Sequence, residues 1–182
     1  LRRQNLDSIV IEKLGLTSRR TPDLSRWKSM VDVCIHPERE VEIAVVGKYM
    51  ELQDAYKSIY ESLAHGGIAN RAKVKLRKIS SDRIDPANPD AALAGVDGVL
   101  VPGGFGIRGV EGKIAAAKWA ARTGVPYFGI CLGMQCATIM AARELAGVST
   151  AHSKEFSDTC APVVDMMEQQ KKLTELGGTM RL

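Results

Sequence analysis

The fold of this chain is decided by the stretch PYFGICLGMQ, residues 126–135. Residues 126–130 are apolar and mostly bulky, which is typical of a buried strand, and a helical pattern runs from about 134 to 145. Between strand and helix stands Cys131, in the pattern Gly-x-Cys-x-Gly. A nucleophile held between two glycines at this place predicts a sharp turn at the tip of a sheet.

Further strands and helices alternate along the chain before this stretch. The predicted strands cover residues 41–47, 74–79, 96–102 and 126–130, and the predicted helices cover residues 55–64, 91–94, 110–122 and 134–145. We expect Asp54 to cap the first of these helices and Gly66-Gly67 to end it. The alternation implies an α/β fold with a mostly parallel sheet and right-handed crossovers.

Residues 1–40 have the pattern of a tail and a linker. A short helix is predicted over residues 6–16, followed by a polar stretch and a charged stretch. The folded domain is predicted to cover residues 41–182. Beyond Ala146 the pattern of regular structure fades, and residues 177–182 have the pattern of a turn into a strand.

Composition narrows the class of protein. The chain has 182 residues, enough for one domain, with 45% hydrophobic and 25% charged residues, as in soluble globular proteins. No apolar run approaches the roughly 20 residues of a membrane span, and nothing suggests export. The net charge of +4 is scattered and aromatic residues are 5%, which argues against nucleic-acid binding and suits a small anionic ligand. The cysteines form no Cys-x-x-Cys pair, so we expect reduced thiols in the cytosol.

Cys131 is the predicted nucleophile. The positive end of the helix that starts at Leu132 would favour the thiolate, and the Leu132 N–H could stabilise an oxyanion. The structural alternative is a small buried residue at a strand end, and the strand–turn–helix context favours the nucleophile. Cys136 lies inside the helix and is expected to pack, whereas Cys34 and Cys160 fall in stretches read as irregular.

A second glycine-rich turn, PGGFG at residues 102–106, follows the strand predicted over 96–102. Its glycine pair lets backbone amides approach a ligand, so the Gly104 N–H is predicted as a second oxyanion donor beside Cys131. A tight turn with positive φ is the alternative. Residues 104–109 also match the dinucleotide fingerprint, but the next strand lacks the terminal carboxylate that would hold a ribose.

Three histidines could serve as the base for a cysteine nucleophile. His36 lies in a charged stretch and is expected at the surface, and His65 is expected at a helix C-terminus. His152 follows the helix after Cys131 and could border the pocket. None has the surroundings of a general base, so the base is expected beyond Leu182.

The motifs at residues 102–106 and 129–135 together resemble the class I (triad) glutamine amidotransferase domain. Further motifs are similar to the CTP synthase family, namely VGKY (46–49), EL (51–52), DAYKS (54–58), RGVEGK (108–113) and GGTMRL (177–182). The likeness runs from about Leu6 to the end of the chain. It implies a flavodoxin-like three-layer fold with a mostly parallel central sheet. Residues 1–40 would be the tail of a synthetase domain plus an interdomain linker, and residues 41–182 an amidotransferase domain incomplete at its C-terminus.

The resemblance implies a glutaminase that feeds ammonia to a synthetase domain. Cys131 would attack the carboxamide of L-glutamine, release ammonia and form a thioester that water converts to glutamate. The amides of Gly104 and Leu132 would stabilise the oxyanion, and Glu155 would accept a hydrogen bond from the α-ammonium group. The residues expected to hold glutamine are Gly104, Leu132, Gly133, Met134, Gln135 and Glu155.

The resemblance also implies properties of a whole enzyme. ATP and Mg²⁺ would activate UTP, which ammonia converts to CTP, and GTP would act as an activator. No cofactor or metal is expected in the amidotransferase domain itself. We expect a cytoplasmic homotetramer, with neither nucleic acid nor membrane as a partner. Lys48 and Tyr49 are expected to face the synthetase or nucleotide side.

The chain departs from the family pattern in several places. No His-Pro-Glu segment follows Cys131, and the arginine for the substrate carboxylate and the ATP-binding P-loop are absent from the sequence. His152 stands where the family usually has asparagine, and this chain alone is expected to turn over little glutamine. Three alternatives stay open. They are the amidotransferase domain of another biosynthetic enzyme, such as GMP synthase or carbamoyl-phosphate synthetase, a nucleotide-binding module on residues 104–109, and an interaction domain that keeps only the fold.

Overall fold

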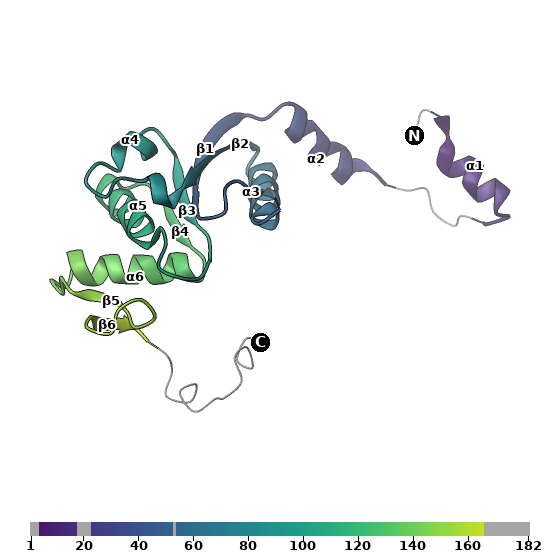
Figure 1. Cartoon of the computed structure of the whole chain (residues 1–182). Helices are drawn as coiled ribbons and strands as arrows, with labels where there is room; N and C mark the ends of the chain where they lie inside the picture. The colour runs from purple at the N-terminus through teal and green to yellow at the C-terminus, as the bar shows by residue number, and fades with distance from the viewer. Residues whose placement is uncertain (1–3, 18–22, 53, 166–182) are drawn as a thin grey trace, which may run out of the picture.

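The computed structural model describes residues 4–17, 23–52 and 54–165 (Figure 1). The helices are α1 (Leu6–Lys13), α2 (Ser25–Ile35), α3 (Lys57–Ala69), α4 (Asp90–Leu93), α5 (Val110–Thr123) and α6 (Leu132–Glu144), with a 3₁₀ turn η2 (Ser81–Arg83). The strands are β1 (Arg39–Gly47), β2 (Ala72–Ser80), β3 (Gly98–Val101), β4 (Tyr127–Gly129), β5 (Ala151–Ser153) and β6 (Ala161–Val164).

The central sheet has four parallel strands in the order β2-β1-β3-β4. Side chains of β1 alternate between its faces, and both faces are buried in the last four residues of the strand. On one face Ala44 and Val46 pack with Trp119 of α5. Figure 1 shows α5 and α6 on this side of the sheet and α3 on the other. The expected three-layer α/β fold with a mostly parallel sheet is therefore confirmed.

A second hydrophobic cluster joins α5 and α6 to the small sheet of β5 and β6. Ile114 of α5 and Ile139 of α6 are buried in it, and Val163 of β6 packs against it. β5 and β6 pair in parallel. The expectation that regular structure fades beyond Ala146 was wrong as far as residue 165, because β5 and β6 lie there. Strands of three and four residues are too short to show a hydrophobic period, and their packing on α6 stabilises them.

The predicted ends of the helix over residues 55–64 were wrong. α3 begins at Lys57 with Tyr56 as its N-cap residue, and Asp54 does not cap it. The helix continues through Gly66 and Gly67 to Ala69. A Cβ on Gly67 would lie 2.6 Å from the carbonyl oxygen of Ala72, so this glycine lets α3 pack closely on β2. Close packing, and not helix termination, accounts for Gly67.

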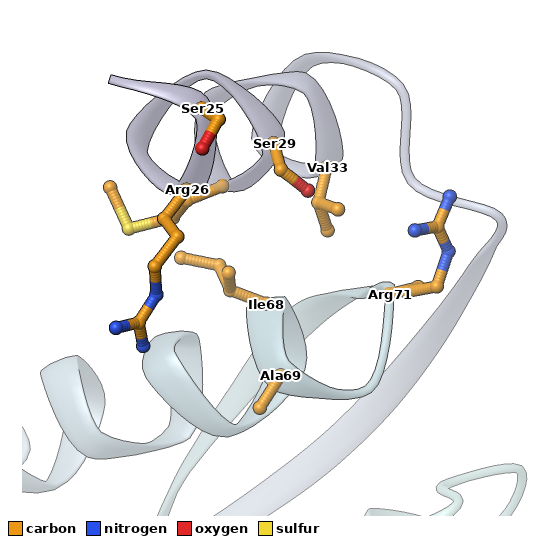
Figure 2. A pocket seen from close by; sticks show the side chains of 8 residues that line it. Ser25, Arg26, Ser29, Val33, Ile68, Ala69 and Arg71 are labelled. Atoms are coloured by element: carbon orange, nitrogen blue, oxygen red, sulfur yellow. The ribbon is translucent and has the colours of Figure 1, made fainter. Parts of the chain in front are cut away.

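The N-terminal helices extend away from the sheet (Figure 1). α1 has no buried residue, whereas α2 buries Val33 beside the end of α3. Figure 2 shows Ser29 and Val33 of α2 facing Ile68 of α3 across a cavity of about 590 Å³, which Arg26 and Arg71 also line. Among the described residues, no helix has the length and apolar character to cross a membrane. The motif at 177–182 lies outside the described residues.

Candidate active site

The predicted turn around Cys131 is present and sharply bent. β4 ends at Gly129, α6 begins at Leu132, and Cys131 between them has φ +53° and ψ −110°. A residue with a side chain rarely adopts positive φ, and such conformations cost on the order of 1–3 kcal/mol. The turn holds the Cys131 side chain exposed at the end of the sheet. We call residues 129–133 the elbow.

Both glycines of the elbow stand where no side chain fits. A Cβ on Gly129 would lie 2.5 Å from the carbonyl carbon of Gly133, and a Cβ on Gly133 would lie 2.0 Å from the carbonyl oxygen of Val101. The first contact brings the end of β4 against the first turn of α6. The second lets α6 lie directly on β3. Close backbone packing therefore explains both glycines of the pattern.

Residues 102–106, which we call the glycine loop, lie beside the elbow. They follow β3, which is adjacent and parallel to β4. The Ile130 N–H donates to the Val101 carbonyl at 2.9 Å, which continues the pairing into the elbow. A Cβ on Gly103 would lie 3.4 Å from the Cβ of Cys131 and 3.9 Å from its Sγ. The sheet thus places two motifs that are far apart in the sequence in direct contact.

Gly104 and Leu132, the predicted oxyanion donors, lie in the two segments that meet at Cys131. Gly104 has φ +153°, a conformation that favours glycine. Leu132 is the first residue of α6, so its N–H has no acceptor within the helix, and its side chain is buried. Gly133, by contrast, uses its N–H within the turn, donating to the Ile130 carbonyl at 2.9 Å. Leu132 follows Cys131 directly, and Gly104 lies in the loop that contacts it.

The other residues expected to hold glutamine lie in the first turn of α6 and just after β5. Met134 is exposed and Gln135 is half-buried in the first turn of α6. Glu155 comes from the segment after β5, and its Oε1 accepts a hydrogen bond from the Gly106 N–H at 3.3 Å. The tertiary structure therefore joins the Glu155 carboxylate to the glycine loop.

Tyr127 fixes the elbow from within β4, a role that the sequence analysis missed. Its hydroxyl donates to the Gly133 carbonyl at 2.7 Å. Burial raises the pKa of Tyr127 above its ordinary value, so the hydroxyl remains a donor at neutral pH. In the sequence Tyr127 is one more bulky residue of a strand, and nothing there indicates this bond.

Lys48, which was expected to face the synthetase or nucleotide side, is buried. Its ammonium group lies beneath the glycine loop and donates to the carbonyl of Phe105 at 2.5 Å and to the carbonyl of Gly106. Burial is the main cause that lowers the pKa of Lys48 from its ordinary value, and the positive charge of the nearby Arg108 lowers it further. Tyr49, the next residue, is partly exposed and its ring lies 6.5 Å from that of Tyr56. The expectation that Lys48 faces the synthetase or nucleotide side was wrong, because its ammonium group binds this chain's own backbone.

Lys113 is a second buried lysine that the sequence analysis did not single out. It is 0% exposed, and its Nζ donates to the Pro102 carbonyl at 3.4 Å. Burial lowers the pKa of Lys113 from its ordinary value. Its spacing was the available signal, since Lys113 lies three residues after Val110 and four before Ala117, both buried on the core face of α5.

The structure places His36 and His65 at the surface and His152 between β5 and α5. His36 is exposed, as expected, and His65 is exposed within α3, which runs four residues beyond it to Ala69. His152 is half-buried: its Nδ1 accepts a hydrogen bond from the Ser153 N–H at 2.9 Å, and its Nε2 lies 3.6 Å from Glu111 Oε1. The contacts of His152 therefore link β5 to α5.

The remaining cysteines differ from Cys131 in their surroundings. Cys136 is fully buried in α6, as expected, and burial raises its pKa to about 11. Cys34 is exposed and lies in α2, so the irregular structure expected there was wrong. Cys160 precedes β6, and its Sγ donates to the Ser157 carbonyl at 3.2 Å. Cys131 is the cysteine that the strand–helix turn presents.

Known protein families and proteins match this chain across the elbow and the glycine loop. The model of the glutamine amidotransferase class-I family matches residues 51–182. A CTP synthase of Symbiobacterium thermophilum is 54% identical over 187 aligned positions, which cover 100% of this chain and 34% of that protein. A CTP synthase of Cytophaga hutchinsonii is 50% identical, with the same coverage of 100% and 34%.

A solved structure shares the fold. It is the glutaminase domain of Trypanosoma brucei CTPS with bound acivicin, which matches with a TM-score of 0.66 and 41% identity over 71% of this chain and 51% of that one. The chain spans about a third of the length of the curated relatives. The family model covers most of the chain, including the elbow and the glycine loop. The chain therefore belongs to the class-I glutamine amidotransferase family.

Proposed function

We propose that this chain is the glutaminase domain of a CTP synthase. The observation that carries the proposal is the placement of Cys131, an exposed thiol on a strained turn, at the start of α6 and beside the glycine loop. The relatives named CTP synthase, at about half identity over the whole chain, support this member of the family over other amidotransferases.

In the proposed reaction the Cys131 thiolate attacks the carboxamide carbon of L-glutamine. The carbonyl oxygen takes up the negative charge, which the amides of Gly104 and Leu132 would stabilise. The C–N bond then breaks, and ammonia leaves with a proton added to its nitrogen, so a thioester remains. Water adds to the thioester, and cleavage of the C–S bond gives glutamate and restores the thiol.

Binding of glutamine would use the same surroundings. The Glu155 carboxylate is presented next to the glycine loop and would accept a hydrogen bond from the α-ammonium group. Met134 and Gln135, in the first turn of α6, would border the substrate. In the family's pattern a His–Glu pair after the nucleophile carries the protons. No His-Pro-Glu segment follows Cys131 in this sequence. We therefore assign the proton transfers to groups other than His36, His65 and His152.

The proposal extends to the whole enzyme. Residues 1–40 would be the tail of the synthetase domain and the interdomain linker, and residues 41–182 would belong to the amidotransferase domain. Ammonia would pass to the synthetase domain, where ATP and Mg²⁺ activate UTP for conversion to CTP and GTP acts as an activator. The amidotransferase domain itself would need no cofactor. The enzyme would be a cytoplasmic homotetramer.

A nucleotide-binding module on residues 104–109 fits the geometry less well. A dinucleotide fingerprint offers free backbone N–H groups to a pyrophosphate. Here the Gly106 N–H is bonded to the Glu155 carboxylate, whose negative charge would repel a phosphate.

Covalent labelling tests the proposal. The full-length polypeptide that carries this sequence is treated with a diazoketone analogue of glutamine, and the modified peptides are identified by mass spectrometry. We expect one adduct on Cys131 that free glutamine prevents, with Cys136 unmodified. An unmodified Cys131, or labelling that glutamine does not slow, would contradict a glutaminase.

Replacement of the nucleophile tests the link to CTP formation. Cys131→Ser is expected to abolish CTP formation from glutamine while leaving CTP formation from added ammonium chloride near the wild-type rate. Equal loss with both nitrogen sources would show that the variant damages the enzyme generally. Full activity with glutamine would exclude Cys131 as the nucleophile.

A further inference from the structure

Lys48, the residue after β1, carries a buried charge beneath the glycine loop. It is 6% exposed, and its ammonium group donates to the carbonyls of Phe105 and Gly106. Its backbone is also held, because its N–H donates to the Tyr56 hydroxyl at 3.1 Å and its carbonyl accepts from Arg108 at 3.3 Å. The lysine is therefore fixed at both its backbone and its charged end.

The peptide group between Phe105 and Gly106 has Lys48 on one side and Glu155 on the other. In a planar trans peptide the C=O and the N–H point in opposite directions. The Phe105 carbonyl points inward to Lys48, so the Gly106 N–H points away from Lys48. It donates to Glu155 Oε1 at 3.3 Å. One peptide thus connects the buried ammonium to the carboxylate that would bind substrate.

The glycine loop needs such an anchor. Three of its five residues are glycine, and glycine loses more conformational freedom on ordering than any other residue. Phe105, at its tip, is 73% exposed and contributes little packing. The conformation of the loop therefore depends on hydrogen bonds to its backbone, of which Lys48 provides two.

We propose that Lys48 is a positioning residue for glutamine hydrolysis. Its ammonium group holds the carbonyls of Phe105 and Gly106 inward, which presents the Gly106 N–H to Glu155 and fixes the Gly103-Gly104 backbone beside Cys131. This inference rests on the proposed glutaminase function. It gives the lysine a role in the site without contact with the substrate.

The test compares Lys48→Met with Lys118→Met in the full-length polypeptide. Methionine keeps the length of the stem and removes the charge, and Lys118 is exposed on α5, where it pairs with Glu144. Lys48→Met is expected to lower kcat/KM for glutamine about 10- to 100-fold, through a higher KM and a lower kcat, because small misplacements of a site cost this much. Lys118→Met should match the wild type, and a wild-type kcat/KM in Lys48→Met would overturn the inference.

A double-mutant cycle separates positioning from general damage. Glu155→Gln is expected to raise KM on its own, and the double variant Lys48→Met/Glu155→Gln is expected to lose less than the product of the two single effects. Residues that act through one peptide are energetically coupled, whereas independent effects multiply. Effects that multiply would overturn the connection through Gly106.

Hydrogen exchange provides a readout that needs no glutamine. Without Lys48, the amides of residues 103–107 are expected to exchange faster, while those of β1 and α5 keep their protection. Lys48→Gln retains an N–H donor and is expected to exchange more slowly than Lys48→Met, which keeps the test informative if the methionine variant folds poorly. Unchanged exchange would overturn the anchoring role. A wild-type enzyme that hydrolyses no glutamine would instead refute the proposed function and leave the exchange result to be judged separately.

Discussion

Gly103 leaves one side of the Cys131 thiol open. A Cβ at Gly103 would lie 3.4 Å from the Cβ of Cys131 and 3.9 Å from its Sγ, which is ordinary contact distance. A methyl group would therefore fit beside the cysteine, but it would cover one side of the sulfur. A substitution at Gly103 can therefore change access to the Cys131 thiol without changing the stability of the elbow.

Gly103→Ala is expected to fold normally and to label about tenfold more slowly with the diazoketone, because the reagent must approach past the new methyl group. The measurement is the rate of Cys131 modification, set beside the thermal midpoint. Gly66→Ala is a suitable control, since nothing lies within 4 Å of its Cβ position in α3. That control should label at the wild-type rate and stabilise the helix by up to about 1 kcal/mol. Wild-type labelling of Gly103→Ala would mean that reagents reach the sulfur from another side.

Cys131→Gly is expected to be more stable than Cys131→Ala by about 1–2 kcal/mol. Residue 131 has φ +53°, which glycine adopts without the steric cost that a Cβ brings. Denaturant unfolding of the two variants measures the difference, and neither should take up the diazoketone. Equal stability would show that the turn relaxes when the thiol is removed and that the wild-type conformation is not strained.

Gly133→Ala is expected to destabilise the protein by about 1–3 kcal/mol or more, as overpacking of a rigid contact does. The new Cβ would lie 2.0 Å from the Val101 carbonyl oxygen, so α6 or β3 has to move. Slower labelling of Cys131 should accompany the loss of stability, because α6 begins at the elbow. A Gly133→Ala variant with wild-type stability would contradict the close packing of α6 on β3.

Lys113→Met is expected to stabilise the protein at neutral pH by about 1–3 kcal/mol. The Lys113 ammonium is 0% exposed and donates to the Pro102 carbonyl at 3.4 Å, so burial costs more than this bond returns. Chemical denaturation at several pH values measures the effect. A destabilised variant at neutral pH would show that Lys113 is better satisfied than this geometry indicates.

The stability difference between Lys113→Met and the wild type should depend on pH. Because burial lowers the pKa of Lys113 in the folded state, the unfolded chain binds more protons than the folded chain between that lowered pKa and 10.5. Wild-type stability therefore rises with pH in this window, relative to the variant, and the advantage of methionine shrinks. A constant difference up to pH 10.5 would contradict the shift.

Much of the fold could be predicted because its signals are local. The central strands show as apolar runs, and the elbow shows as glycines at fixed positions around Cys131. The sequence could not indicate the strands β5 and β6, whose few residues are ordered by packing on α6. Nor could it show that α3 passes through Gly66 and Gly67, because the reason is a contact with Ala72 on the next strand.

The candidate site divides in the same way. The sequence by itself indicated the elbow around Cys131, the glycine loop and the family, since each depends on residues adjacent in the chain. Only the tertiary structure decided where the long polar side chains go: Lys48 binds the loop carbonyls, Glu155 meets the Gly106 amide, and Lys113 lies inside the core. The physical reason is that a flexible charged side chain takes its place from distant partners, whereas a strained turn is fixed by the backbone of its own few residues.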